Sequence, residues 1–127
     1  MQEVKQEVSE VIDAYFEMWN EDDATRRDSI IARLWTPDGS YTDPLLEASG
    51  TTALSQMIGA VQDKYPDHRF TRTSGIDVHH TSARYAWELA GPDGSVLVGG
   101  VDIADITDDG RLERVTGFFG PIPELGA

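Results

Sequence analysis

The spacing of apolar residues changes once along this chain, and the change limits the folds open to it. Up to about residue 65, apolar side chains recur every three or four residues, the period of a helix with one buried face. After the turn at Tyr65-Pro66-Asp67 they recur at every second residue, as in the strands of a sheet. Helices that precede a run of strands predict an α+β fold.

Three helices are predicted in the first half of the chain. The first covers about residues 3–21, the second about 24–35, and the third begins at Gly50 and ends near Tyr65. Between the second and third helices, residues 36–39 predict a turn, and residues 40–44 predict a short strand that ends at a proline. The helical part of the fold therefore precedes most of the sheet.

Four further strands are predicted in the second half. They cover about residues 68–79, 83–90, 95–106 and 111–120. Strong turn signals at residues 91–94 and 108–110 join the later strands closely, so we expect these strands to lie antiparallel. No repeat or linker interrupts the pattern, and we expect a single domain over residues 1–127.

Composition and charge narrow the classes of function. The chain has no cysteine, and no apolar run approaches the roughly 20 residues that span a bilayer. Its start lacks the basic and apolar segments of a signal peptide, so a cytoplasmic location is the expectation. The net charge of −13 disfavours nucleic acid and anionic membranes as partners and favours a neutral or cationic small ligand.

Asp102 is the most informative single residue. Alternation along the predicted strand 95–106 separates its side chains into two faces. One face carries Val96, Val98, Gly100, Asp102, Ala104 and Ile106. Asp102 is the only ionisable residue among them, and burial there would raise its pKa and keep it neutral near pH 7. The alternative is a solvated aspartate at a strand end or a bulge.

The order of the predicted elements, together with five short motifs, resembles a known superfamily over nearly the whole chain. The motifs are Trp35-Thr36-Pro37-Asp38-Gly39, Tyr41-Thr42-Asp43-Pro44, Gly50-Thr51, Tyr65-Pro66-Asp67 and Gly117-Phe118-Phe119-Gly120. They are similar to the SnoaL-like branch of the NTF2-like (cystatin-like α+β) fold. The resemblance implies three N-terminal helices packed in a strongly curved antiparallel sheet that forms a cone-shaped pocket.

Three residues match the catalytic pattern of one branch of that superfamily, the ketosteroid isomerases. Tyr15 lies in the first helix, Asp43 precedes Pro44 in the short strand, and Asp102 lies in the penultimate strand. The resemblance implies that Asp43 abstracts a proton next to a carbonyl group. Tyr15 and a neutral Asp102 would then donate hydrogen bonds to the enolate oxygen. We expect the substrate pocket to be lined by Trp19, Tyr85, Trp87, Leu89, Phe119 and His80.

Other interpretations of these residues stay open. Tyr15 suits an ordinary core position, and Asp43 suits a turn cap ahead of Pro44. His79 or His80 could pair with a carboxylate in a hydrolase or a dehydratase. The superfamily also contains non-catalytic ligand-binding modules, so the fold alone does not decide the function. We expect no cofactor and no metal site, because no typical metal-binding spacing of histidines is present.

The leading hypothesis is a small-molecule enzyme. Its chemistry would be proton transfer, as in isomerisation or cyclisation, on a neutral hydrophobic carbonyl compound such as a steroid-like or polyketide substrate.

The opposite face of the predicted strand 95–106 is also apolar, and it needs another surface to shield it from water. It carries Leu97, Val101 and Ile103. Because NTF2-like proteins commonly pair through such faces, the resemblance implies a homodimer through the outer face of the sheet.

Overall fold

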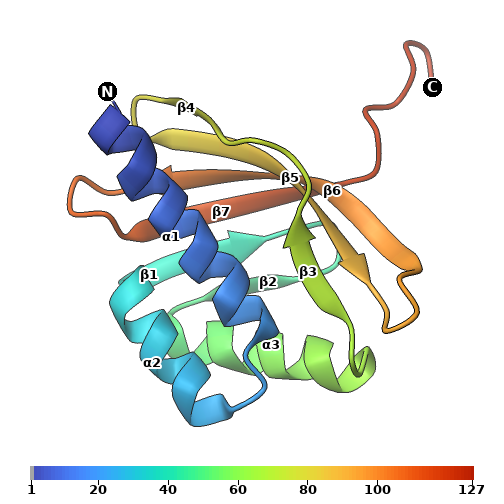
Figure 1. Ribbon diagram of the computed structural model, residues 1–127, viewed down its shortest axis with the longest axis horizontal. Helices are drawn as coiled ribbons and strands as arrows, with labels where there is room; N and C mark the ends of the chain where they lie inside the picture. Colours follow the sequence, from blue (N-terminus) through green and yellow to red (C-terminus); the bar gives the residue numbers. More distant parts are fainter. Residues whose placement is uncertain (1) are drawn as a thin grey trace.

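The computed structural model describes residues 2–127, with side chains from residue 7 onward. Within that part of the chain it has three helices, α1 (Gln2–Asn20), α2 (Ala24–Leu34) and α3 (Thr51–Lys64). The same part forms seven strands: β1 (Trp35–Thr42), β2 (Glu47–Ser49), β3 (Arg69–Arg72), β4 (Asp77–His79), β5 (Ser82–Ala90), β6 (Val96–Ile106) and β7 (Leu112–Phe119). Figure 1 shows α1 lying across one face of the sheet. No helix among the described residues is long and apolar enough to cross a membrane.

The three helices lie where the sequence predicts them, because local signals begin each one. Asp23 caps α2, and its side chain accepts a hydrogen bond from the Arg26 backbone N–H at 2.9 Å. Gly50 precedes α3 with a φ of 88°, a conformation that glycine adopts without strain. The boundaries of these helices differ from the predicted ones by only a residue or so.

The sheet differs from the predicted one in the direction of one strand. Its order is β2-β1-β7-β6-β5-β3, and β4 pairs separately with β5. The pairs β5–β6 and β6–β7 are antiparallel, as their short turns predict, but β1 runs parallel to β7. The prediction of a wholly antiparallel sheet is therefore wrong, and the sheet is mixed. A helix and five strands separate β1 from β7 in the sequence, so no turn constrains their relative direction.

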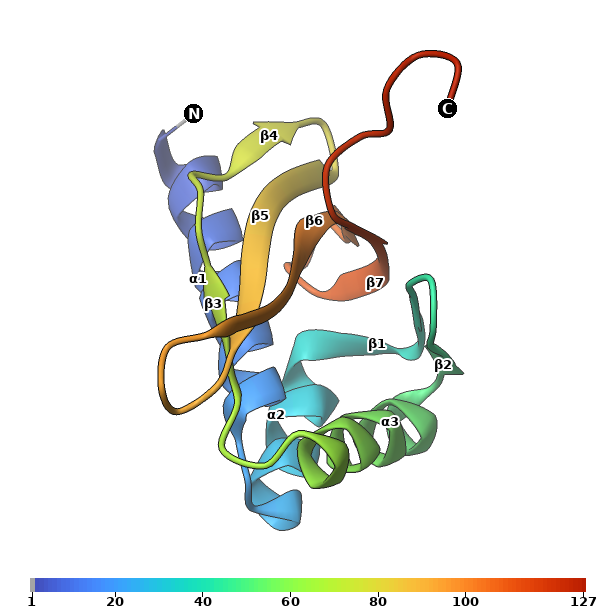
Figure 2. The ribbon, with the colours of Figure 1, turned by 90° about the vertical axis from the view of Figure 1, so that its right-hand side faces the viewer.

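The prediction of a strongly curved cone is also wrong. Figure 2 shows β5 and β6 bending along their length, but the sheet does not curl strongly around the helices. Large side chains fill the space between α1 and the inner face of the sheet, since Tyr15, Trp35 and Tyr85 are almost completely buried there. Because protein interiors are close-packed, these rings limit how tightly the sheet can wrap.

The strand prediction 68–79 merges two separate strands, β3 and β4. The chain leaves the sheet between them because the Ser74 hydroxyl accepts the Ala86 backbone N–H at 2.8 Å, replacing a strand partner. The predicted turn at residues 36–39 lies inside β1, where it forms a bulge: Trp35 pairs with Leu112, whereas Ser40 pairs with Arg114. Strand β2 was not predicted, because three residues are too few to show a period.

A buried arginine joins the three helices. The Arg27 guanidinium donates hydrogen bonds to the Glu21 carbonyl at 3.1 Å, to Gln62 Oε1 at 3.0 Å and to Ser55 Oγ at 3.4 Å. The Gln62 amide in turn donates to the Glu21 and Trp19 carbonyls at 2.8 and 3.1 Å. These bonds fix the connection between α1 and α2 against α3, and they hold the end of α1 that carries Trp19.

Candidate functional site

Asp102 points from β6 into the interior, as the alternation of its strand predicts. Its neighbours across the sheet are Tyr85 on β5 and Gly117 on β7. The side chain is 3% exposed, and among the described residues only Arg27 is another buried charged side chain. A carboxyl group in such a place is costly as an anion unless it is paired or hydrogen-bonded.

Burial raises the pKa of Asp102 to about 7, and the neighbouring charge of Asp43 acts in the same direction. Tyr15, Tyr85 and Trp87 oppose this shift, because each brings a donor near the carboxyl group. None of the three forms a hydrogen bond of normal length and angle with it, so burial dominates. Asp102 therefore keeps its proton through the acidic range, loses it around pH 7, and can act as a donor while it is protonated.

Three buried polar atoms around this carboxyl group have no hydrogen-bond partner. They are Asp102 Oδ1, the Tyr85 hydroxyl and Trp87 Nε1. Buried polar atoms in native proteins are almost always hydrogen-bonded, and each exception calls for a specific explanation such as a catalytic role or a bound molecule. The three unpaired atoms therefore mark this part of the interior as a candidate site.

A small cavity opens beside Asp102. It is lined by Tyr15, Phe16, Trp19, Tyr41, Phe70, Trp87 and Asp102. Its volume of about 10 Å³ is close to the minimum that holds one water molecule. The walls are otherwise aromatic, and Trp19 packs against Phe70 and Tyr41 with ring centroids 4.7 and 5.5 Å apart. The cavity wall thus consists of aromatic rings and a single carboxyl group.

Burial also raises the pKa of the Tyr15 hydroxyl well above its usual range, and the Asp102 carboxyl adds to the effect. Tyr15 is 2% exposed and packs edge-on against Tyr85, with ring centroids 6.2 Å apart. Its hydroxyl therefore stays protonated and is available as a donor. Tyr15 is a core aromatic, as the alternative interpretation holds, and it also borders the cavity.

Asp43 lies beside the cavity, although it does not line it. The Tyr41 hydroxyl donates to Asp43 Oδ2 at 2.7 Å, and the Leu45 and Leu46 backbone N–H groups donate to Oδ1 at 2.8 Å each. Asp43 therefore caps the turn between β1 and β2, as one of the two interpretations predicts. Tyr41 connects this carboxylate to the cavity wall, because it contributes to both.

Gly117 leaves the space in which the two carboxyl groups approach one another. A Cβ atom at this position would lie 2.9 Å from Asp102 Oδ1, 3.3 Å from Asp43 Cβ and 3.5 Å from the Tyr41 hydroxyl. Real Cβ atoms essentially never show contacts under 3.0 Å, so a side chain here would displace Asp102. The three polar residues converge at this point because residue 117 has no side chain.

Replacing Gly117 with alanine is expected to destabilise the protein by about 1–3 kcal/mol, because the added methyl group overpacks the site. Urea denaturation measures this change in the free energy of unfolding. The matched control is Gly75→Ala, because nothing lies within 4 Å of a Cβ atom at Gly75. If the two variants were equally stable, the conclusion that Asp102 and Asp43 pack closely against Gly117 would be wrong.

Only some of the expected pocket residues lie at this cavity. Trp19 and Trp87 line it, whereas Tyr85 and Leu89 are buried on the same face of β5 without lining it. Phe119 is half-buried and packs edge-on against Trp87 with ring centroids 5.8 Å apart, so it supports the wall from behind.

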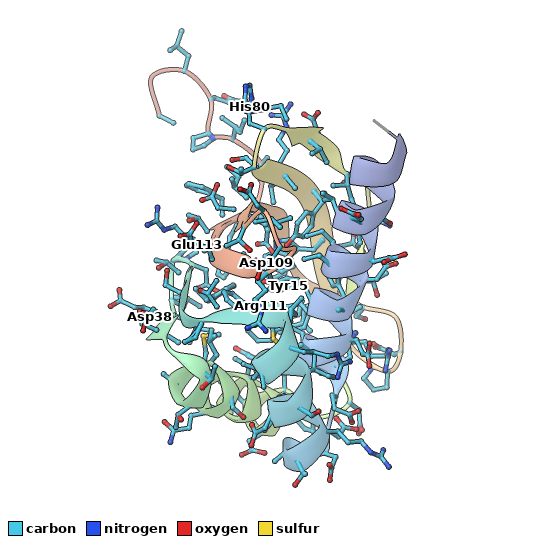
Figure 3. The ribbon with its side chains drawn as sticks, turned by 90° about the vertical axis from the view of Figure 1, so that its left-hand side faces the viewer. Tyr15, Asp38, His80, Asp109, Arg111 and Glu113 are labelled. Carbon is cyan, nitrogen blue, oxygen red and sulfur yellow. The ribbon has the colours of Figure 1, made fainter. Side chains whose placement is uncertain are left out.

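The structure does not bring the histidines to Asp102. His80 is exposed at the turn between β4 and β5, where its φ of 52° interrupts the alternation of the strand. Its Nδ1 atom lies 3.1 Å from Nδ1 of the exposed His79. Figure 3 shows His80 at one end of the molecule, well separated from Tyr15. Among the described residues, no group of three potential metal-binding side chains lies together.

Four residues of the site were not predicted: Phe16, Tyr41, Phe70 and Gly117. Tyr41 had a usable signal, because residues two apart on a strand share a face and Asp43 is already a candidate. Phe16, Phe70 and Gly117 reach the site through tertiary packing, and their local sequence carries no signal for it.

Comparison with solved structures identifies the class of protein as an NTF2-like α+β domain. An NTF2-like protein of unknown function from Exiguobacterium sp. 255-15 is 21% identical and covers 88% of this chain and 99% of its own, with a TM-score of 0.68. A candidate polyketide cyclase from Sinorhizobium meliloti is 16% identical over 85% of this chain and 93% of its own, also with a TM-score of 0.68. At these identities the likeness extends to the fold alone.

A third structure defines the family. A candidate isomerase of the SnoaL-like family from Agrobacterium tumefaciens str. C58 is 31% identical, covers 91% of this chain and 99% of its own, and superposes with a TM-score of 0.86. The chain therefore belongs to the SnoaL-like family. No family model and no curated protein sequence matches the chain significantly.

Proposed function

We propose that this protein catalyses proton transfer at a carbon atom next to the carbonyl group of a neutral hydrophobic compound. The observation that carries the proposal is the buried, unpaired carboxyl group of Asp102 in an aromatic cavity. The similarity to a candidate isomerase of the same family, at 31% identity, supports the same class of chemistry. Double-bond isomerisation and ring closure are the two outcomes that such a proton transfer allows.

In the proposed reaction Asp43 acts as the base. Its carboxylate removes a proton from the carbon next to the carbonyl group and becomes a carboxylic acid. The electron pair of the broken C–H bond moves into the C–C bond, and the carbonyl oxygen gains the negative charge of an enolate. Tyr15 and the protonated Asp102 donate hydrogen bonds to that oxygen.

The enolate then has two routes. In isomerisation, the Asp43 carboxylic acid returns its proton to a different carbon of the conjugated system, and the double bond moves. In cyclisation, the enolate carbon forms a bond to a second carbonyl carbon of the same molecule, and the new alkoxide takes up the proton. Both routes return Asp43 to its ionised form.

The surroundings of Asp102 favour a flat apolar substrate. Aromatic rings form most of the cavity wall, and the net charge of −13 disfavours anionic compounds. The cavity of about 10 Å³ has room for the substrate oxygen only. The rest of a substrate has to displace side chains of the wall, and the half-buried Phe16 and Phe70 are the ones that we propose to move.

Deuterium exchange tests this proposal without knowledge of the natural substrate. The protein is incubated in D₂O with a panel of neutral cyclic ketones, and deuterium at the carbon next to the carbonyl group is read by NMR. Exchange should fall as the pH rises through about 7, because Asp102 then loses the proton that it donates. A carbon-detected titration, assigned with Asp102→Asn, should give the same pKa. A titration at the ordinary aspartate value of 3.8 would count against the proposal.

We also propose that a second copy of this chain covers the outer face of the sheet. Phe118 and Val101 are direct neighbours on β7 and β6 and are 57% and 38% exposed. Leu97 and Ile103 on β6 extend this apolar surface. Arg84 lies opposite Ile103 at the edge of this surface, and Asp77 balances its charge at 2.8 Å, so this edge adds little to the repulsion between two copies of a chain of charge −13.

The oligomeric state tests this pairing. Sedimentation should give twice the chain mass of 14.0 kDa for the wild-type protein, and Phe118→Glu should give the single-chain mass. Ala32→Glu is the matched control, because Ala32 is exposed on α2, among the helices rather than on the outer face of the sheet, and its substitution should leave the dimer intact. A wild-type protein that sediments as a single chain would overturn the pairing.

A further inference from the structure

Trp87 carries a buried donor that the proposed reaction does not yet use. The side chain is 5% exposed on β5, and its Nε1 atom has no hydrogen-bond partner. An indole N–H can only donate, and the neighbouring Asp102 carboxyl group does not accept it at hydrogen-bonding distance and angle, so this N–H needs another acceptor. Since buried donors without a partner are rare, the position of this N–H calls for an explanation.

The indole ring is held in place by packing. A Cβ atom at Gly100, its neighbour across the sheet, would lie 3.0 Å from Trp87 Cζ2 and 1.9 Å from the Phe118 carbonyl oxygen. Residue 100 therefore has to be glycine for the ring to lie where it does. Phe70 and Phe119 pack against the ring, each with centroids 5.8 Å away. The N–H is thus fixed by its neighbours.

Trp87 borders the same cavity as Asp102 and Tyr15. The cavity holds about 10 Å³, so the three residues surround a space for roughly one oxygen atom. Together they offer an indole N–H, a carboxylic O–H and a phenolic O–H. A neutral carbonyl oxygen has two lone pairs, whereas an oxygen with a full negative charge accepts a third hydrogen bond.

We propose that the Trp87 indole N–H is a third donor to the ligand oxygen, and that the site therefore selects ligands whose buried oxygen becomes an anion conjugated with a flat apolar system. This inference rests on the proposed function, which puts an enolate oxygen in the cavity. The third hydrogen bond reaches full strength only as charge develops on the oxygen, so it stabilises the transition state more than the bound carbonyl compound. Enolates and phenolates belong to the selected class.

A stable phenolate tests the inference directly. We choose 4-nitrophenol as the probe, because its anion has the oxygen–carbon conjugation of an enolate and cannot be turned over. The chain has three tryptophans, so the indole N–H region of a ¹H–¹⁵N spectrum has three signals. The Trp87 signal, assigned by its loss in Trp87→Phe or by elimination with Trp19→Phe and Trp35→Phe, should move downfield when the probe saturates the protein.

Affinity gives the second measurement. Trp87→Phe keeps an aromatic ring and removes the N–H, so it should weaken binding of the probe by roughly 10-fold or more. Trp35→Phe is the matched control: Trp35 lies outside the cavity, and its N–H already donates to Met18 Sδ at 3.2 Å. This control should bind the probe as the wild-type protein does.

The outcomes separate this inference from the proposed function. If the probe binds while the Trp87 signal stays in place and Trp87→Phe keeps its affinity, the third donor is wrong and the proposed function stands. If the probe does not bind to the wild-type protein and no ketone exchanges its protons, both are wrong. If ketones exchange but the probe does not bind, the selection for conjugated oxyanions is wrong.

Discussion

Asp43→Asn is expected to slow deuterium exchange into a ketone by roughly 10²- to 10⁴-fold, the range typical of a general acid–base group. The amide has the shape of the carboxylate but cannot accept the proton from carbon. Its Oδ1 atom can still accept the Leu45 and Leu46 N–H groups, so the turn between β1 and β2 should persist. The variant therefore removes the base and keeps the cap.

Asp38→Asn is the matched control for this experiment. Asp38 is an exposed residue of β1, the strand that precedes Asp43, and Figure 3 shows its side chain pointing out from the edge of the molecule. The control removes one negative charge and leaves the cavity untouched, so exchange should continue at the wild-type rate. Wild-type exchange in Asp43→Asn would limit Asp43 to its role as a turn cap and require another base.

The two roles of Asp43 explain why sequence reasoning could not choose between them. An aspartate before a proline predicts a turn cap, and a match to a catalytic pattern predicts a base. The structure has the three donors of a cap, and the contact with Tyr41 also joins the carboxylate to the cavity wall. One side chain meets both descriptions, so only a rate measurement separates them.

The parts of the fold that depend on local signals could be predicted. Asp23 and Gly50 determine where α2 and α3 begin, and the short turns determine the antiparallel order of β5, β6 and β7. The inward position of Asp102 follows from the alternation of a single strand. Each of these features is specified within about ten consecutive residues.

The parts that depend on distant pairing could not be predicted. Gly117 meets Asp43 because β7 lies parallel to β1, and no nearby turn indicates that pairing. His80 lies outside the pocket in which we expected it, because a positive φ at the β4–β5 turn redirects the chain there. The cavity also draws on α1, β1, β3, β5 and β6, so its small size emerges only when all five elements are packed.

Burying Asp102 has a cost in stability that a single substitution should reveal. The pKa is about 7 in the folded protein and 3.8 in the unfolded chain, so between these values the folded state holds a proton that the unfolded chain has released. Stability therefore falls as the pH rises through this range. At about 1.4 kcal/mol per pKa unit, the loss reaches about 4 kcal/mol above pH 7.

Asp102→Asn should remove this loss, because the amide is neutral at every pH and resembles the protonated acid in shape. The variant should gain stability over the wild-type protein by roughly 2–3 kcal/mol more at pH 8 than at pH 5. Urea denaturation of both proteins at the two pH values measures the difference. Deuterium exchange should decline in the same variant, because the amide N–H is a weaker donor than a carboxylic acid.

A protein of charge −13 has other groups that titrate over this range, so the comparison needs a charge control. Asp38→Asn removes one exposed carboxylate, and its free energy of unfolding should follow that of the wild-type protein from pH 5 to pH 8. A gain confined to Asp102→Asn at high pH would identify the buried carboxyl as its source. If the free energies of unfolding of Asp102→Asn and the wild-type protein changed equally with pH, Asp102 would ionise as easily inside the protein as in water. Asp102 could then not act as a neutral hydrogen-bond donor.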